Sequence, residues 1–400
     1  MRCLDPVRGR HRENRLEKQR GIPITAPHRV DGCQWSATLS IILPCDVCHR
    51  LPAPPCCPEQ GVVTVSASWQ TFLDQTGAVR DTDGTVLHFG RPPTRVALPQ
   101  LHVCDHLRIV TLRGPDAVTF LQGQVTADVR EVSEQQYSRL AMHLSLKGRG
   151  LVSMRLVPAE DGFDLLVPTA MADSLLKLLG KYIVFSKASL ALDDTRVVLS
   201  LVGGDAVPAV PDDLPAGKAA FTADGTAVRM DGHRTLLVLP VETAIAHWAA
   251  LSEGRGIGGA EHARLHDILA GEGHVLPGAE DLFLPQALNY DVLHGVSFRK
   301  GCYTGQEVVA RMHFKGQMKQ RLQHVSWPGD TPLPAGTVLR DANGKALGEL
   351  VDSMTAGGQV QALAVLRLAH EGDLYLQSED GQAHALGARP ETLPYELPAR

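Results

Sequence analysis

The segment Lys300-Gly-Cys-Tyr-Thr-Gly-Gln-Glu307 places a thiol, an amine and a carboxylate within a short stretch of chain. The thiolate, and not the thiol, is the nucleophile and metal ligand, so the surroundings of Cys302 decide its chemistry. Lys300 lies two residues away and a predicted helix N-terminus follows, and both favour the negatively charged sulfur. The segment is therefore a candidate reactive-thiol site, although an ordinary capped surface helix would show the same residues.

The residues after the cysteine predict this helix and a positively charged surface. Thr304 and Glu307 have the spacing of a capping box, which starts the helix at Gly305. Glu307 and Arg311 are four residues apart and can form an ion pair on the helix surface. Over residues 299–321 a single acid, Glu307, is outnumbered by basic residues, which predicts a local attraction for anions. The basic residues are Arg299, Lys300, Arg311, Lys315, Lys319 and Arg321.

The bulk composition is that of a globular protein with a sizeable core. The 400 residues are 44% hydrophobic and 21% charged, which excludes wholesale disorder, collagen and coiled coil. No run of apolar residues is long enough for a transmembrane helix, and free thiols suit a reducing compartment, so we expect a cytoplasmic protein without membrane contact. A net charge of −5 gives no global basic footprint, so direct binding to nucleic acid is not expected.

The first 62 residues differ from the rest in cysteine content and charge. Six of the eight cysteines and a net charge of +3 (nine basic minus six acidic residues in 1–60) fall there. Cys45-Asp-Val-Cys48-His49 fits the haem-attachment pattern, and the alternative is a zinc cluster with Cys56 and Cys57. Proline clusters and the lack of periodicity favour a third interpretation, in which 1–62 is a disordered or mistranslated extension and translation starts near Val62–Val65.

From about residue 66, apolar periodicity predicts α+β structure followed by an all-β region. Beyond residue 319, short apolar runs separated by Pro, Gly and Asp are typical of a small antiparallel barrel. We therefore expect one domain over 63–317 and a second over 318–400. The principal predicted strands are 106–112, 139–146, 150–157, 163–167, 183–192 and 196–202, and the helices are 169–180, 241–252 and 260–270.

Two histidines and a cysteine outside the motif are of residue types that bind metal ions. His262 and His266 are four residues apart and share a helix face. With neither a third ligand nor a glutamate between them, they are predicted to be structural. Cys104 is predicted to be a buried thiol.

The octapeptide 300–307 resembles the signature of the YgfZ family. Members of that family are folate-binding relatives of the glycine-cleavage aminomethyltransferase, or T-protein. The resemblance covers the chain from about residue 100 to 397. Further similar segments occur in the expected order at 120–129, 146–149, 181–187, 283–286, 296–301 and 393–396.

The resemblance implies an α+β, T-protein-like fold with two α+β folate-binding subdomains and a C-terminal antiparallel β-barrel around a central pocket. It implies tetrahydrofolate or a derivative as the cofactor, and no metal. Cys302 would be the reactive thiol and Lys300 its electrostatic partner. The side chains that the resemblance and the charge of the folate glutamate tail assign to the cofactor are Lys147, Arg149, Tyr303, Gln306, Glu307 and Arg311.

For function, the resemblance implies an accessory protein that supports assembly or repair of iron–sulfur enzymes, including tRNA-modifying ones. Cys302 would act as nucleophile, cluster ligand or redox group. We expect a monomer whose partners are a folate and iron–sulfur client enzymes, and an accessory role rather than an enzymatic one. The alternatives are a tetrahydrofolate-dependent aminomethyltransferase or one-carbon transferase, and a non-catalytic protein-binding module.

Two positions depart from the pattern that these relatives show. The T-protein carries an acidic pair after a glycine turn, where this chain has Ser153 and Met154. Without carboxylates there, aminomethyl transfer is not expected. Relatives commonly carry a glutamate against the pterin where this chain has Leu269, and Glu272 is a displaced substitute.

Overall fold

The computed structural model describes residues 66–94, 99–204, 207, 209–378 and 382–398. The chain divides into two units, Met1–Gln60 and Gly61–Arg400, and every described residue belongs to the second. The predicted extension over 1–62 and both cysteine patterns within it lie outside the described residues. None of the helices in the described ranges is long and apolar enough to cross a membrane.

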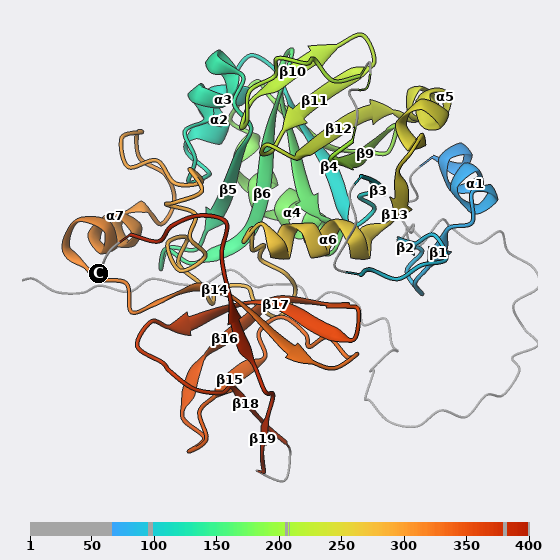
Figure 1. The fold of residues 1–400 in the computed structure, drawn as a ribbon. Helices are drawn as coiled ribbons and strands as arrows, with labels where there is room; N and C mark the ends of the chain where they lie inside the picture. The colour runs from blue at the N-terminus through green and yellow to red at the C-terminus, as the bar shows by residue number, and fades with distance from the viewer. Residues whose placement is uncertain (1–65, 95–98, 205–206, 208, 379–381, 399–400) are drawn as a thin grey trace, which may run out of the picture. The chain divides into compact units, whose positions relative to one another are not determined.

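A five-stranded antiparallel sheet forms one layer of the α+β part (Figure 1). Its order is β5 (Arg139–Leu144), β6 (Gly150–Ala159), β7 (Gly162–Pro168), β4 (Leu107–Arg113) and β8 (Ser189–Asp193). Its apolar side chains share a core with neighbouring helices, because strands and helices alike present one apolar face. The helical segments are α2 (Ala117–Gln122), α3 (Val129–Gln135), a 3₁₀ turn (Thr169–Met171) and α4 (Ala172–Ile183).

A second, eight-stranded sheet has its own core around two stacked helices. Trp69 of α1 (Ala67–Gln75) and Trp248 of α5 (Val241–Ser252) meet edge to face with ring centroids 5.8 Å apart. Among the described strands of this sheet, β13 and β3 are the one parallel pair. The strand order is β1 (Val79–Arg80), β2 (Val86–His88), β13 (Gly256–Gly258), β3 (Gln100–Val103), β9 (Arg196–Val202), β12 (Arg234–Pro240), β11 (Gly225–Arg229) and β10 (Ala219–Thr222).

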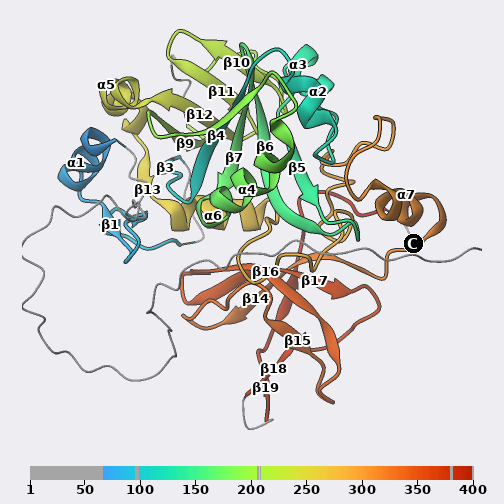
Figure 2. The same ribbon diagram turned by 180° about the vertical axis from the view of Figure 1, so that it is seen from behind.

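The third sheet is antiparallel, curled and built from the C-terminal strands (Figure 2). Helix α6 (Ala260–Leu269) packs against β16 and β17 of this sheet and also against β2 and β3, so it lies between two sheets. Helix α7 (Gln306–Lys315) precedes the sheet in the chain. The strand order is β19 (Ala383–Ala385), β18 (Tyr375–Gln377), β15 (Val338–Arg340), β16 (Ala346–Ala356), β17 (Gln359–Arg367), β14 (Gln320–Pro328) and β20 (Arg389–Glu391).

The predicted α+β order followed by antiparallel strands is confirmed, and two local predictions are wrong. The helix predicted to end at Gly180 continues to Ile183, because Gly180 keeps a right-handed conformation inside the helix. The strand predicted over 183–192 covers only Ser189–Asp193. The apolar run that suggested an earlier start is the end of α4 and the turn after it, where Val184 and Phe185 are exposed.

Candidate functional site

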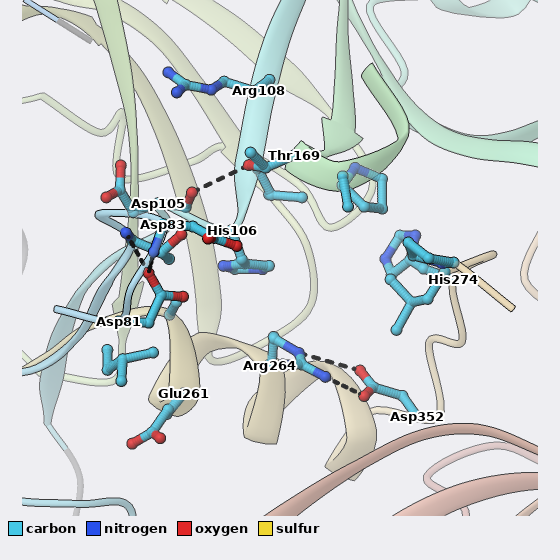
Figure 3. Close-up of a pocket in the computed structure, with 18 of the residues that line it drawn as sticks. Asp81, Asp83, Asp105, His106, Arg108, Thr169, Glu261, Arg264, His274 and Asp352 are labelled. Carbon is cyan, nitrogen blue, oxygen red and sulfur yellow. Dashed lines mark hydrogen bonds and ion pairs between the residues drawn. The ribbon is translucent and has the colours of Figure 1, made fainter. Parts of the chain in front are cut away.

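A cavity of about 610 Å³ lies between the two α+β sheets and the curled sheet, with α6 along one side (Figure 3). The turn between β1 and β2, the start of β4 and the loop between β14 and β15 complete its wall. Because six separate segments and two further residues contribute, the site exists only in the folded protein. Its wall comes from segments within 80–87, 105–108, 168–170, 260–267, 274–277 and 333–335, with Gln70 and Asp352.

Acidic side chains dominate the polar part of the cavity wall. Asp105 accepts a hydrogen bond from the Val86 backbone nitrogen at 3.0 Å. The Arg264 guanidinium binds both carboxylate oxygens of Asp352, which ties α6 to β16, and Asp352 raises the pKa of Arg264. Glu261 on the first turn of α6 forms no hydrogen bond or ion pair with any described residue. The Glu261 carboxylate therefore has all its acceptors unused, in contrast to the engaged Asp105 and Asp352.

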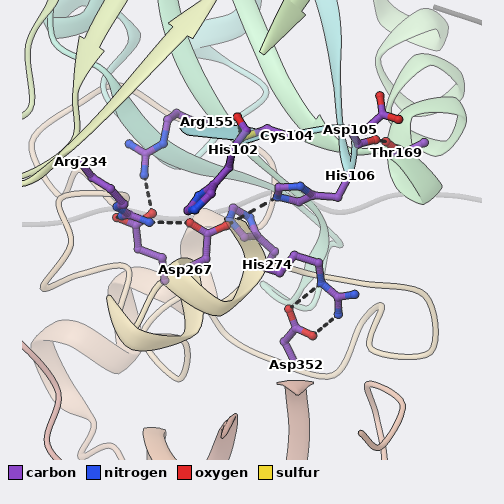
Figure 4. A network of polar contacts seen from close by, with 12 residues as sticks. His102, Cys104, Asp105, His106, Arg155, Thr169, Arg234, Asp267, His274 and Asp352 are labelled. Carbon is purple, nitrogen blue, oxygen red and sulfur yellow. Dashed lines mark hydrogen bonds and ion pairs between the residues drawn. The ribbon is translucent and has the colours of Figure 1, made fainter. Parts of the chain in front are cut away.

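A buried charge network lies behind this wall (Figure 4). Arg234 is 5% exposed, and its guanidinium donates to Asp267 at 2.6 Å and to Glu272 at 2.9 Å. Arg155 donates to the other oxygen of Glu272 at 2.7 Å. Burial alone would raise the pKa of Asp267, but nearby His106 and Arg234 outweigh it and lower that pKa. Glu272 is thus an anchor for two arginines.

His106 joins the network to the cavity. Its ring lines the cavity, and its Nε2 lies 3.7 Å from an Asp267 oxygen. Both ring nitrogens are buried without a hydrogen-bond partner among the described residues. Buried polar atoms are normally paired, so His106 is a wall residue with unused hydrogen-bonding capacity.

The two histidines singled out on α6 do lie together, with a third ring beside them. The ring centroid of His102 is 5.7 Å from that of His262 and 5.1 Å from that of His266. Burial lowers the pKa of both His262 and His266 to about 4, so the rings are neutral at pH 7. Within the described ranges, no group of three or more His, Cys, Asp or Glu side chains is arranged to hold a metal ion.

Cys302 lies elsewhere, in the loop before α7, where it is an exposed free thiol. The predicted capping box is wrong, because the residue that caps α7 is Gly305 in a left-handed conformation with φ 79°. No side chain caps the helix, and Gln306 Oε1 instead accepts a hydrogen bond from the Tyr303 nitrogen at 3.3 Å. Glu307 and Arg311 are both exposed and form no ion pair with one another.

Lys300 is buried below this loop. Its Nζ donates to the carbonyl oxygens of Val125 and Ala127, each at 2.7 Å, and lies 5.0 Å from the Tyr303 ring centroid. Burial lowers the pKa of Lys300 to about 7, against a smaller opposing effect of Asp128. The side chain therefore fastens the cysteine loop to the segment after α2.

The turn 147–150 packs directly on α7. A Cβ on Gly148 would lie 2.8 Å from Val308 Cβ, and one on Gly305 would lie 2.5 Å from the Ser145 carbonyl oxygen, so both positions need glycine. Arg149 is exposed and donates to the carbonyl oxygens of Asp281 and Leu282. Lys147 is exposed and lies 4.0 Å from Asp281.

The predicted site residues thus share one region, and none of them lines the cavity. The structure brings the turn carrying Lys147 and Arg149 to the helix that follows Cys302, which sequence spacing does not show. Conversely, the sequence reasoning missed His106, Glu261 and the Arg264–Asp352 pair. These residues carry no local motif, and their only signal is that separate segments fold together.

Comparisons with known proteins agree on family and fold. The sequence matches no family model. It is 32% identical over 322 residues, 77% of this chain and 96% of the relative, to the tRNA-modifying protein YgfZ of Klebsiella pneumoniae. The solved aminomethyltransferase T of the glycine cleavage system from Bartonella henselae superposes with a TM-score of 0.65 at 18% identity, covering 81% of this chain and 96% of that one. The α+β, T-protein-like fold is therefore confirmed, and the chain belongs to the YgfZ family.

Proposed function

We propose that this protein binds a reduced folate in the central cavity and supports assembly or repair of iron–sulfur enzymes, including tRNA-modifying ones. The observation that carries the folate assignment is the cavity wall, in which the Glu261 carboxylate and the His106 ring form no hydrogen bond with any described residue. The name of the Klebsiella relative, a tRNA-modifying protein, supports the proposed link to tRNA modification.

The residues present fit a folate. The cavity volume of about 610 Å³ suits a ligand of that size. A pterin ring presents several N–H donors, for which carboxylates such as Glu261 are acceptors, and Leu107 and Leu276 offer apolar contact to its faces. When bound, tetrahydrofolate supplies a carrier for one-carbon units.

The folate glutamate tail needs cations, and those at the cavity are already paired. Arg80 lies 2.9 Å from Asp74, and Arg264 is held by Asp352. The tail would therefore compete for these arginines or extend into solvent. Two predictions concern residues that lie outside the cavity wall, and both are still to be tested. The first is that the folate tail binds Lys147, Arg149 and Arg311. The second is that the folate contacts Tyr303, Gln306 and Glu307.

Cys302 is proposed to act on the client enzyme as nucleophile, cluster ligand or redox group. An exposed thiol is accessible to a protein partner, and the buried Lys300 holds its loop in place. Aminomethyl transfer is not favoured by the geometry. Ser153 stands where an acid would be needed, and its hydroxyl accepts a hydrogen bond from the Val275 nitrogen at 2.8 Å.

Calorimetric titration of the full chain with tetrahydrofolate, together with complementation in cells, tests the proposal. We expect saturable binding, and we expect Cys302→Ala to bind folate normally yet fail to restore a client iron–sulfur enzyme. Absence of binding would contradict the folate assignment. Full complementation by both Cys302→Ala and Lys300→Ala would contradict the role of the loop.

A further inference from the structure

A groove of about 820 Å³ runs beside the C-terminal half of α7 and is separate from the central cavity. Its apolar lining comes from Met312 and Met318 and from Leu368 and Ala369 after β17. Methionine side chains are flexible and polarisable, so they adapt to apolar groups of varied shape. This lining is suited to the side chains of a partner protein.

The charge of the groove is positive. Lys319 immediately precedes β14, and Arg367 is the last residue of β17. Because Gln320 of β14 pairs with Arg367, the two cations lie at the same end of the sheet. Both are exposed, and neither side chain has a carboxylate partner among the described residues. Asp291 also lines the groove, but it is engaged by Arg321 through two hydrogen bonds of 2.9 Å.

The groove offers little to a nucleic acid base. Among the described residues that line it, His313 is the one aromatic ring, and it is stacked on Phe298 with centroids 3.6 Å apart. Non-specific binding of single strands relies on open aromatic faces as well as cations. The combination of an adaptable apolar lining and unpaired cations favours an acidic peptide over RNA.

We propose that this groove binds an acidic segment with apolar side chains from a partner protein. Resting on the proposed function, the inference identifies where an iron–sulfur client would dock. The groove and the cysteine loop share helix α7, which begins four residues after Cys302. A segment bound in the groove would thus hold its protein against the same helix that follows the exposed thiol.

Fluorescence anisotropy of the full chain with labelled 14-residue peptides tests the proposal. The probes are an alternating Glu/Leu peptide, its Lys/Leu counterpart, a Glu/Ser peptide and a U12 RNA. We expect the Glu/Leu peptide to bind at least tenfold more tightly than the other three, and to weaken as salt rises. Equal or tighter binding of the RNA or of the Lys/Leu peptide would overturn the proposal.

Charge reversal locates the binding. The double variant Lys319→Glu/Arg367→Glu should bind the Glu/Leu peptide at least tenfold more weakly and should gain affinity for the Lys/Leu peptide. Urea unfolding like that of wild type shows that the variant is folded. Lys345→Glu, an exposed cation on the β15–β16 turn, is the matched control and should bind like wild type. Unchanged Glu/Leu binding by the double variant would place the peptide elsewhere and overturn the proposal.

The groove and the proposed function can fail separately. The double variant should bind tetrahydrofolate like wild type, because neither cation lines the central cavity. Failure of wild type to bind tetrahydrofolate would contradict the cavity assignment, while the peptide measurements would still decide the groove. Selective peptide binding with normal complementation by Cys302→Ala would support the groove and contradict the thiol role.

Discussion

The central cavity and the Cys302 region differ in almost every physical property. Around the cavity, the charges of Arg234, Asp267 and Glu272 are buried and paired, as suits a preformed site for a small ligand. In the Cys302 region, the thiol and Arg311 of α7 are exposed and form no ion pair with any described residue. The difference fits the proposed division into two tasks, with a folate in the cavity and another protein at the α7 face. The following predictions test that division.

Removing the thiol should have the largest effect on function. Cys302→Ala is expected to abolish support of the client enzyme, because the substitution deletes the reactive atom. Stability should change by less than about 0.5 kcal/mol, since the side chain is exposed. Client-enzyme activity in complemented cells and urea unfolding measure the two effects. A variant that loses stability in step with activity would contradict a direct role for the sulfur.

Breaking the buried network should have the largest effect on stability. Arg234→Met leaves the Asp267 and Glu272 carboxylates without their main cation, and we expect a loss of about 3–5 kcal/mol in the free energy of unfolding. Urea unfolding measures the loss, and Lys345→Met, at an exposed position, serves as control. A decrease in the free energy of unfolding below about 1 kcal/mol would show that the network does not stabilise the cavity wall.

The histidine cluster should make the protein sensitive to acid. The pKa values of His262 and His266 are about 4 in the folded state, below the usual 6.5. The unfolded chain therefore takes up protons first as pH falls below about 6.5, and stability is lost until about pH 4, by about 3 kcal/mol per histidine. Urea unfolding of wild type and His266→Asn at pH 7 and pH 4.5 measures this loss. We expect a smaller loss for the variant, and equal losses would contradict the assignment.

Loosening the cysteine loop should have the smallest effect. Lys300→Met leaves the Val125 and Ala127 carbonyls without their donor, and we expect a loss of about 1–3 kcal/mol. If Lys300 positions the loop, the alkylation rate of Cys302 should also change, whereas a purely structural role would leave that rate unaffected. Arg299→Met, the exposed neighbour, is the control for both measurements.

Sequence reasoning succeeded where neighbouring residues decide the structure. The strand at Leu107–Arg113 and the helix at Val241–Ser252 follow from apolar periodicity. It failed at the capping box, because the left-handed Gly305 overrides the Thr304–Glu307 spacing.

The candidate site was predicted only in part. The motif around Cys302 is contiguous and visible in the sequence. The cavity is not, because Arg264 on α6 and Asp352 on β16 meet only through tertiary packing. The glutamate that relatives place against the pterin shows the same limit of sequence reasoning. Leu269 stands where a glutamate was expected, whereas Glu261 reaches the cavity wall from one end of the same helix.

The separation of the two regions is tested most directly by tetrahydrofolate affinity in matched variants. We predict that Glu261→Gln weakens binding at least tenfold, because a charged hydrogen bond is lost. Cys302→Ala, Arg149→Ala and the exposed control Glu371→Gln should stay within twofold of wild type. Normal binding by Glu261→Gln together with weakened binding by Arg149→Ala or Cys302→Ala would place the folate at the α7 surface and contradict the account.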